Sequence, residues 1–391
     1  MTLTAYTNAR IFDGETSHEN AALVVDGSRI HSIGPVPPGA DTVALDGGIL
    51  VPGFVDLQVN GGGGHLVGPG TTMADLALVC ATHARFGVTA LLPTLITDTP
   101  AATDAVIAAA AAATRNRVPG LLGLHLEGPH LDPRRRGAHD PALIRPMEEA
   151  DLVRLERARA VLPHLLVTLA PEAATPEQIA RLVAAGIVVS LGHSDAGYDA
   201  ATAAFRAGAS MATHLFNAMS PLGNREPGLV GAVLDHGIAA GLIADGIHIH
   251  PATLGVALRA GRSPGRLFLV SDSMAQAGTA LAAFTLNGRT IHRRDGALRL
   301  ADGTLAGADL TLDAAIRNAH LLLGLPLETA LAMSSTLPAT ALGVAEAGRL
   351  APGGAADFVH LTEGLALRNC WSAGRPVAGA AQAGGAAAAS S

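Results

Sequence analysis

The chain has 391 residues, 49% of them hydrophobic, with a mean hydropathy of +0.35, which allows a large core that needs no disulfides. A formal net charge of −7 argues against a nucleic-acid partner, and the sequence shows no apolar run long enough to suggest a membrane partner. Without a signal-peptide pattern, and with Cys80 and Cys370 lacking metal-ligand spacing and best explained as buried thiols, the sequence predicts a cytoplasmic protein.

The first 50 residues contain short strands separated by Asp-Gly and Pro/Gly turns, a pattern typical of a small β domain. The expected strands are residues 5–12, 21–25, 29–33 and 42–45. A β pattern returns after residue 348, with a strand expected at 356–361. We therefore predict a small β-sandwich built from both chain ends, residues 1–50 and 348–375. The Ala/Gly-rich residues 376–391 predict a disordered tail.

Residues 51–347 alternate between apolar strands and helices, which predicts a parallel α/β architecture. The expected strands are 49–60, 90–93, 121–127, 165–170, 188–193, 211–214, 239–244 and 267–272, and the expected helices are 73–86, 99–114, 151–160, 176–185, 199–207, 228–234, 251–261, 310–323 and 326–333. This number of strands favours a TIM-like (β/α)8 barrel over an open sheet. Residues 284–300 depart from the pattern and predict a β-hairpin, with Asn287-Gly288 and Asp295-Gly296 as turns.

Glu127, His193, His214 and Asp272 each end one of the expected strands. The carboxyl ends of barrel strands meet at one rim, where TIM barrels carry their active sites. A buried carboxylate needs a positive partner, and carboxylate and imidazole ligands suit zinc or another divalent first-row metal. Each residue alone also fits a structural role, a salt-bridged or capping glutamate or a hydrogen-bonded histidine. Their common position favours a metal site formed by Glu127, His193 and His214.

Six segments together resemble the amidohydrolase superfamily and, within it, the N-acetylglucosamine-6-phosphate deacetylase family. In chain order they are PGFVDLQVNG at 52–61, HLEGP at 125–129, GHS at 192–194, THLFNAM at 213–219, ADGIH at 244–248 and SD at 271–272. Each segment is weakly informative alone, whereas their order is specific. The resemblance implies a metal-dependent hydrolase barrel that removes acetate from a phosphorylated amino sugar and works as a homodimer.

The resemblance also implies a role for individual residues. Glu127, His193 and His214 would bind the metal, Asp272 would act as general base and then acid, and His139 would polarise the substrate carbonyl. The substrate would be held by Ala138, His139, Asn217, the backbone of Ala218, Arg225, Asp245, His248, Leu305, Ala306 and Gly307, with a phosphate ligand able to come from the neighbouring subunit. Without the resemblance, Arg225 reads as a surface residue, and Asp245 with His248 as a hydrogen-bonded structural pair.

Gln58 and Asn60 stand where many amidohydrolases have a His-x-His pair that builds a second metal position. Amides are poor zinc ligands, and the chain has no lysine that could be carbamylated to bridge two metals. The resemblance therefore implies the mononuclear Gln-x-Asn branch. One divalent metal is expected per subunit, Zn²⁺ before Fe²⁺, Co²⁺ or Mn²⁺. The competing explanation of Gln58 and Asn60 is that they are ordinary turn residues.

Other functions stay open from the sequence alone. A deacetylase of N-acetylgalactosamine 6-phosphate would differ in its substrate at one hydroxyl group. Another amidohydrolase, such as a cyclic amidase or a deaminase, fits less well because Arg225 and His248 imply a phosphate. A scaffold without metal would not need Glu127, His193, His214 and Asp272 together.

Two groups of residues near the predicted site also have alternative explanations. The run at 134–136 is three arginines, which either steer an anionic substrate or form a solvated loop. His65, His125 and His130 are assigned supporting or packing roles, although they lie close in sequence to the predicted site residues.

Overall fold

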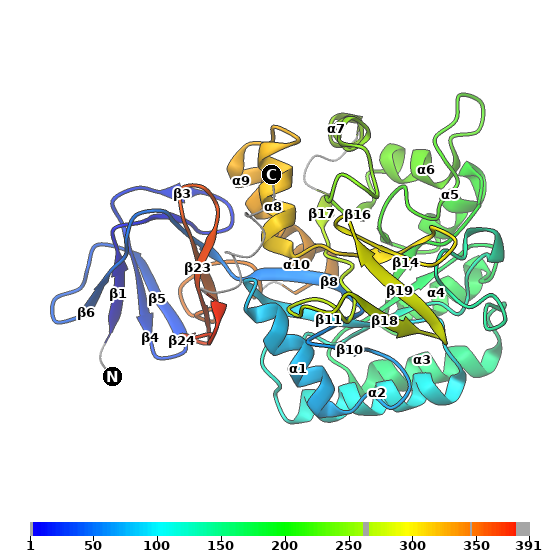
Figure 1. Ribbon diagram of the computed structural model, residues 1–391, viewed down its shortest axis with the longest axis horizontal. Helices are drawn as coiled ribbons and strands as arrows, with labels where there is room; N and C mark the ends of the chain where they lie inside the picture. The colour runs from blue at the N-terminus through cyan, green and yellow to red at the C-terminus, as the bar shows by residue number, and fades with distance from the viewer. Residues whose placement is uncertain (1–2, 261–265, 345, 381–391) are drawn as a thin grey trace.

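The chain forms a larger α/β body and a smaller body of strands, which Figure 1 shows side by side in this computed structural model. The structure describes residues 3–260, 266–344 and 346–380. None of the helices in these ranges has the length and apolar character that crossing a membrane requires. The two cysteines, Cys80 and Cys370, are free and buried.

The larger body is built on a barrel of eight parallel strands within the described ranges. They are β8 (Phe54–Val59), β11 (Val88–Ile96), β12 (Leu124–Glu127), β13 (Leu165–Leu169), β14 (Val188–Leu191), β15 (Met211–Ala212), β16 (Ala239–Leu242) and β17 (Leu267–Leu269). A parallel bridge between Val59 and Ser273 closes the barrel, and the Asp272 N–H donates to the Gln58 carbonyl at 3.0 Å. The predicted TIM-like barrel is confirmed, and its seam places Asp272 beside the end of β8.

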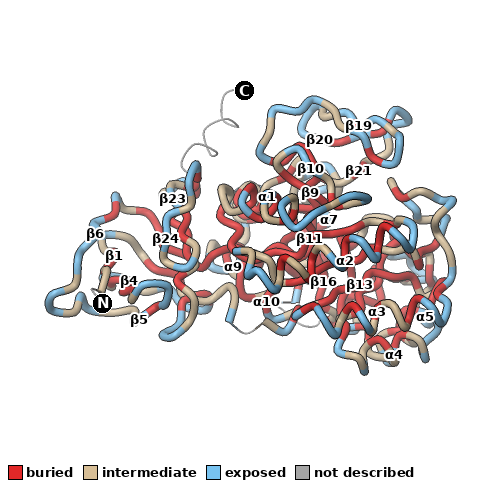
Figure 2. The backbone as a smooth tube through the Cα atoms, turned by 90° about the horizontal axis from the view of Figure 1, so that it is seen from below, coloured by how far each residue is buried: buried red, intermediate tan, exposed pale blue. Residues whose placement is uncertain are grey.

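Helices surround the strands, whose residues are almost all buried, as the red segments of Figure 2 show. The described helices are α1 (Met73–Ala84), α2 (Pro100–Arg115), η1 (Pro133–Arg135), α3 (Glu149–Val161), α4 (Pro176–Ala184), α5 (Tyr198–Arg206), α6 (Gly228–His236), α7 (Pro251–Ala260), α8 (Leu312–Leu321), α9 (Leu327–Ala332) and α10 (Thr336–Leu342). Local sequence sets several boundaries. A capping box of Thr72 and Asp75 begins α1, and Gly237, at φ 62°, ends α6. Strands buried on both faces explain why the sequence shows continuous apolar runs rather than alternation.

The smaller body is a sandwich of two sheets. One sheet contains β5 (Arg29–Gly34), β4 (Ala22–Asp26), β1 (Thr4–Thr7) and β6 (Asp41–Ala44), and the other contains β24 (Arg375–Pro376), β23 (Leu367–Ser372), β22 (Phe358–Leu361), β7 (Ile49–Pro52), β2 (Arg10–Phe12) and β3 (Ser17–His18). Phe358 stacks on Trp371 with ring centroids 4.6 Å apart, and Tyr6 meets both rings edge-on. The chain ends therefore share one core, as the sequence predicted.

Two long strands expected from the sequence are each divided in the structure. Residues 5–12 form β1 and β2, which lie in different sheets and are separated at Asn8, where φ is 63°. Residues 49–60 form β7 in the sandwich and β8 in the barrel, separated at Gly53. A Cβ at Gly53 would lie 2.0 Å from the Thr89 hydroxyl, so only glycine allows the chain to pass this point. The predicted tail began at Pro376, which belongs to β24, and residues 381–391 lie outside the described ranges.

An antiparallel insertion follows β17 in the chain and covers one side of the barrel rim. It contains β18 (Ala283–Leu286), β19 (Arg289–Arg294), β20 (Ala297–Arg299) and β21 (Leu305–Ala308). Figures 1 and 2 show it close to the short strands β9 (Gly61–Gly62) and β10 (His65–Leu66). The hairpin predicted at 284–300 is present, with both Asn-Gly and Asp-Gly turns at positive φ. The strand β21 was not predicted.

Candidate active site

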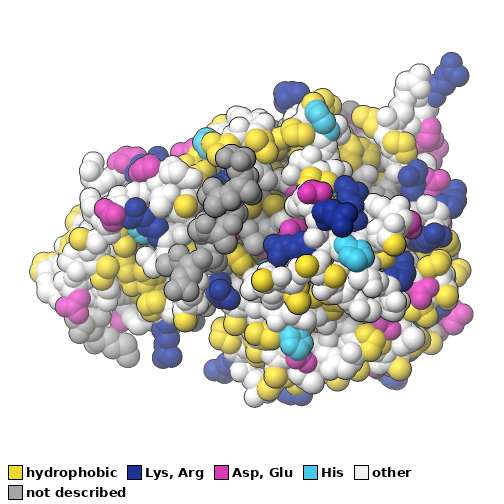
Figure 3. Space-filling view, in the orientation of Figure 1, with side chains coloured by type: hydrophobic (Ala, Val, Ile, Leu, Met, Phe, Trp, Pro, Cys, Tyr) yellow, Lys and Arg dark blue, Asp and Glu magenta, His cyan; other side chains and the backbone are white. Residues whose placement is uncertain are grey.

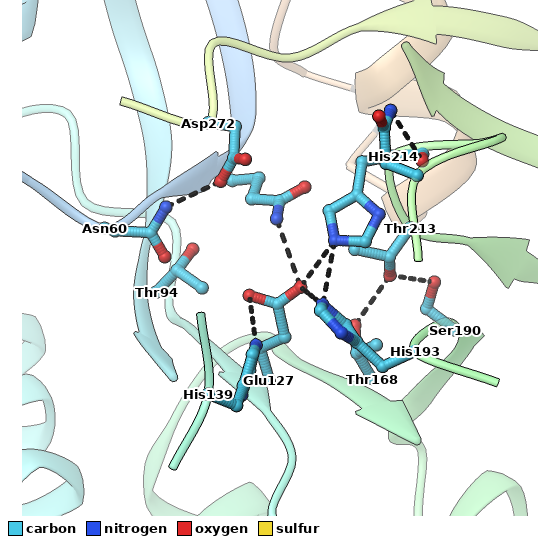
Figure 4. Close-up of polar contacts among 12 residues, drawn as sticks. Asn60, Thr94, Glu127, His139, Thr168, Ser190, His193, Thr213, His214 and Asp272 are labelled. Atoms are coloured by element: carbon cyan, nitrogen blue, oxygen red, sulfur yellow. Dashed lines mark hydrogen bonds and ion pairs between the residues drawn. The ribbon is translucent and has the colours of Figure 1, made fainter. Parts of the chain in front are cut away.

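The four strand-end residues meet at the rim of the barrel, as Figure 4 shows. Glu127 is the last residue of β12, His193 follows β14, His214 follows β15 and Asp272 follows β17. All four are buried. His193, His214 and Asp272 have φ values of 48°, 33° and 49°, a left-handed backbone that is costly for residues other than glycine. Such conformations gather at functional sites, and here they turn three side chains into one space.

Glu127, His193 and His214 bring three ligand atoms together. The Glu127 Oε1 lies 3.0 Å from His214 Nε2 and 3.3 Å from His193 Nε2, and the two Nε2 atoms are 3.1 Å apart. Ligands held at about 2.1 Å around a tetrahedral zinc ion lie roughly 3.4 Å apart. The three distances are close to that spacing, so these residues fit a divalent cation.

A backbone contact selects the tautomer of a neutral His193 ring. Its Nδ1–H donates to the Arg135 carbonyl at 2.8 Å, so in that tautomer the lone pair is on Nε2, the atom that faces Glu127 and His214. Burial alone would raise the pKa of Glu127. Its contacts with His193 and His214 outweigh burial and hold that pKa well below the usual range. Glu127 therefore offers a carboxylate to this space.

His139 is a second histidine that approaches Glu127, and with Glu127 and His193 it forms another set of ligand-type atoms within 4.8 Å of one another. Its Nε2 lies 3.9 Å from Glu127 Oε2. The backbone N–H of Thr97 donates to His139 Nδ1 at 3.3 Å, and the Thr97 hydroxyl lies 2.7 Å from the same atom. Because Nδ1 accepts, the proton of the neutral ring is on Nε2. His139 therefore presents an N–H donor rather than a ligand lone pair, which distinguishes it from the neutral His193 ring.

Asp272 faces the three candidate ligands from the opposite side of the gap in Figure 4. Burial raises its pKa to about 6, against the opposing effect of His214, and the charge of Glu127 raises it further. The Asn60 amide donates to Asp272 Oδ1 at 2.7 Å, and the Gln58 amide donates to Glu127 Oε1 at 3.3 Å. Each carboxylate thus accepts a neutral N–H donor from one of the two amides, and such donors do not coordinate metals.

A cavity of about 370 Å³ opens beside these residues. Its lining includes most of the residues predicted to hold the substrate: Ala138, His139, Asn217, Ala218, His248, Leu305, Ala306 and Gly307. Two predicted residues stand apart from this lining. Asp245 lies behind His248 and accepts its Nδ1–H at 2.6 Å. Arg225 is exposed on the loop 221–226 and is not among the residues that line the cavity.

The segment after β15 has an unusual backbone. His214, Phe216 and Ala218 have positive φ values of 33°, 77° and 50°, whereas the residues between them do not. The intervening N–H groups bond within the protein, from Leu215 to the Gly241 carbonyl and from Asn217 to the His214 carbonyl. Asn217 and Ala218 line the cavity together with His248. This end of the cavity therefore places a side-chain amide and an imidazole close to the three ligand-type residues.

Arginines also reach the cavity lining, through Arg134 and Arg135. Both are paired with Asp195, at 3.1 and 2.6 Å respectively, so they are neither unpaired steering charges nor a purely solvated loop. Figure 3 shows basic side chains close to acidic ones on this body. The Arg135 carbonyl also orients His193, which gives this loop a supporting role at the site.

Sequence reasoning missed Thr97 and a buried hydroxyl network beneath the site. Thr97 follows β11 directly, and this strand-end position was the available signal. In the network, His125 Nε2 lies 2.7 Å from the Thr168 hydroxyl, which lies 2.7 Å from the Thr213 hydroxyl, next to His214 in the chain. The supporting role expected of His125 agrees with this geometry. His130, 3.8 Å from a carboxylate, and His65, at 3.2 Å from another, lie away from the ligand atoms.

A (β/α)8 barrel with a carboxylate, imidazoles and an aspartate at the carboxyl ends of its strands defines the class of metal-dependent hydrolases. The sequence profile of the amidohydrolase family matches residues 49–377, and the chain belongs to this family. The structural match to a solved relative covers nearly the whole length of both chains, so it includes the barrel, the sandwich and the insertion.

The similar proteins have closely related names. The N-acetylgalactosamine-6-phosphate deacetylase of Shewanella sp. (strain ANA-3) is 42% identical over 87% of this chain and 86% of its own. The N-acetylglucosamine-6-phosphate deacetylase of Haemophilus influenzae is 38% identical over 83% of this chain and 85% of its own. The crystal structure of the N-acetylglucosamine-6-phosphate deacetylase from Pasteurella multocida is 34% identical, covers 96% of this chain and 99% of its own, and superposes with a TM-score of 0.92.

Proposed function

We propose that the protein hydrolyses the acetamido group of N-acetyl-D-glucosamine 6-phosphate to give D-glucosamine 6-phosphate and acetate. One observation carries the proposal: Glu127, His193 and His214 converge opposite Asp272, in a cavity that Asn217 and His248 also line. The converging residues suit metal-assisted amide hydrolysis, and the amide and imidazole at the other end can bind a phosphate. The names of the relatives agree with this pairing.

Glu127, His193 and His214 would hold one divalent cation per subunit, Zn²⁺ in the first place, with Fe²⁺, Co²⁺ or Mn²⁺ as alternatives. When bound, such a cation lowers the pKa of water toward ~7 and polarises a carbonyl. Gln58 and Asn60 donate N–H groups to the carboxylates, which supports a single cation, and these positions would be the vestige of a second site.

The side chains supply the remaining chemistry in this proposal. Asp272 accepts a proton from the attacking water, whose oxygen forms a bond to the acetamide carbon. The Nε2–H of His139 donates to the carbonyl oxygen as negative charge develops there. Asp272 then returns the proton to the nitrogen as the C–N bond breaks, so the sugar leaves as an amine and the acetyl group as acetate.

The phosphate would lie beside Asn217, the Ala218 backbone and His248, whose ring is held in place by Asp245. Arg225 lies on an exposed loop of its own subunit, so we propose that it binds the phosphate of a neighbouring subunit in a homodimer. Leu305, Ala306 and Gly307 would form the wall along the sugar. Arg225→Ala should raise KM for the phosphorylated sugar without changing the metal content, whereas an unchanged KM would remove Arg225 from the phosphate site.

A second candidate is the deacetylation of N-acetyl-D-galactosamine 6-phosphate, because the Shewanella relative at 42% identity bears that name. The test is acetate release from 6-phosphorylated and unphosphorylated N-acetyl-glucosamine and N-acetyl-galactosamine, with zinc supplied. The proposal expects the highest kcat/KM for N-acetylglucosamine 6-phosphate. Preference for N-acetylgalactosamine 6-phosphate would establish the second candidate. Preference for an unphosphorylated sugar would favour the activity of another amidohydrolase.

The same preparation tests whether the protein is an enzyme at all. Elemental analysis after zinc reconstitution should find one metal per chain, and the absence of stoichiometric metal would favour a scaffold. We also propose a cytoplasmic location. It rests on Cys80 and Cys370, two buried free thiols that show no use of disulfides in the described chain.

A further inference from the structure

The insertion formed by β18 to β21 is hydrogen-bonded to the candidate site at two separate points. At the end of β21, the Ala308 N–H donates to the Asp272 carbonyl at 2.8 Å. At the start of β19, the Arg289 guanidinium donates to the Ala138 carbonyl. Ala138 directly precedes His139 in the chain. One small sheet thus holds the backbone of the proposed base and the backbone beside the proposed carbonyl donor.

The path between the two points is continuous and packed. Leu286 pairs with Arg289 across the first turn, Arg294 pairs with Ala297 across the second, and Ala297 pairs with Ala308. The inner face of the insertion forms its own apolar core, separate from that of the barrel, and Ala138 packs against it. A sheet with its own core transmits position better than an isolated loop, because packed interiors deform little.

His139 needs such support because it lies on an irregular segment. Between β12 and α3 the chain has only the short η1, and Gly137, at φ 55°, is left-handed just before Ala138 and His139. The N–H and hydroxyl groups of Thr97 both meet the ring at Nδ1, so they fix the position of that one atom more than the direction of the opposite edge of the ring. The peptide that joins Ala138 to His139 sets the direction of the side chain. A second anchor at the Ala138 carbonyl therefore fixes where Nε2–H points.

We infer that Arg289 is a positioning residue that acts through His139. This inference rests on the proposed deacetylation, in which the His139 N–H must meet the carbonyl oxygen. Among the described residues, Arg289 is not one of those that line the cavity. It therefore works on the loop that carries the donor, and its removal affects the transition state more than substrate binding.

The test compares Arg289→Met, Arg289→Lys and the control Arg294→Met, an exposed arginine of the same strand. We expect Arg289→Met to lower kcat by about 10- to 100-fold, with KM within about twofold, because small misplacements of reacting groups have effects of this size. Arg289→Lys should recover most of kcat, since an ammonium also donates to a carbonyl. Arg294→Met should behave as the wild type, and all variants should keep the metal content and melting temperature of the wild type.

A double-mutant comparison separates positioning from direct action. In a His139→Ala background, Arg289→Met should cause no further loss of kcat, because the residue through which it acts is gone. A multiplicative loss, a rise in KM alone, or a normal kcat for Arg289→Met would each overturn the inference.

A wild type without acetate release would instead overturn the proposed function. The imidazole ¹H–¹⁵N signal of His139 would still test the anchor. That signal should shift in Arg289→Met and stay unchanged in Arg294→Met, and an unchanged signal in both would refute the anchor.

Discussion

Asp272→Asn is the substitution that most directly tests the proposed chemistry. It removes one charge and one proton acceptor but keeps the size of the side chain. Asp272 is buried and accepts the Asn60 amide at 2.7 Å, a bond that the amide oxygen of the variant can also accept. The distances among Glu127, His193 and His214 do not depend on this side chain. The fold and the metal content are therefore expected to survive.

The expected loss of turnover follows from the single role that is removed. Positioned acid–base groups contribute about 10²- to 10⁴-fold, which corresponds to roughly 3–5 kcal/mol of activation free energy. In the proposed mechanism Asp272 serves both proton transfers, so we expect kcat to fall within that range at saturating N-acetylglucosamine 6-phosphate. The assay is acetate release, combined with elemental analysis and thermal melting of the same preparation.

A matched control is Asp295→Asn, the same chemical change at an exposed turn of the insertion. Asp295 has a φ of 53°, which asparagine tolerates, so the control should retain full turnover and stability. Turnover of Asp272→Asn within threefold of the wild type, with metal bound, would refute the assignment of Asp272. A loss of turnover accompanied by a loss of metal would show that Asp272 supports binding rather than proton transfer.

Three further predictions concern stability. Thr168→Val should lower the free energy of unfolding by about 1–3 kcal/mol in urea titrations, because the buried His125 Nε2 loses its partner at 2.7 Å; an unchanged midpoint would mean that the network relaxes. Burial lowers the pKa of His83 to about 4, while the unfolded chain keeps the ordinary value near 6.5. Between pH 6.5 and pH 4 the unfolded state binds this proton and the folded state does not. The free energy of unfolding therefore falls as the pH is lowered through this window, by roughly 2 kcal/mol at pH 5. His83→Gln should lessen this pH dependence between pH 7.5 and 5 in denaturant titrations, and an identical dependence would contradict the reasoning. Removing metal with a chelator should lower the melting temperature, and zinc at about 100 times its Kd should restore roughly 3 kcal/mol of the free energy of unfolding. A melting temperature that changes with neither treatment would argue against the site.

The sequence predicted the strand-end residues well because their physical signal is local. Leu121 to Leu126 form an apolar run that stops on Glu127, and a carboxylate placed there is too costly without a partner. The same reasoning applies to His193 and His214. Parallel strands in a barrel bring such ends together whatever the loops do, so a local pattern predicted a contact between residues far apart in the chain.

Other features depend on packing between distant segments, which no local pattern reports. The break at Gly53 arises because Thr89 leaves no space for a Cβ, and that contact exists only once β8 and β11 are paired. The role of Thr97 depends on the path of a long loop that returns His139 to the end of β11. The role proposed for Arg225 would depend on a second subunit. Each of these three features depends on a contact with a distant segment, which the local sequence around the residue does not indicate.

The seam that closes the barrel also limits how many cations the proposed site can take. The Asp272 N–H donates to the Gln58 carbonyl, and the Asn60 amide donates to the Asp272 carboxylate, so the closed barrel holds these amides against the acids. The charges of Glu127 and Asp272 together balance one divalent cation in a buried site. A second divalent cation would need further anionic ligands, because unpaired buried charge is strongly disfavoured. The chain has no lysine to form a carbamate, and neutral amides add no charge. Charge balance and barrel closure therefore favour the same single-metal arrangement for independent reasons.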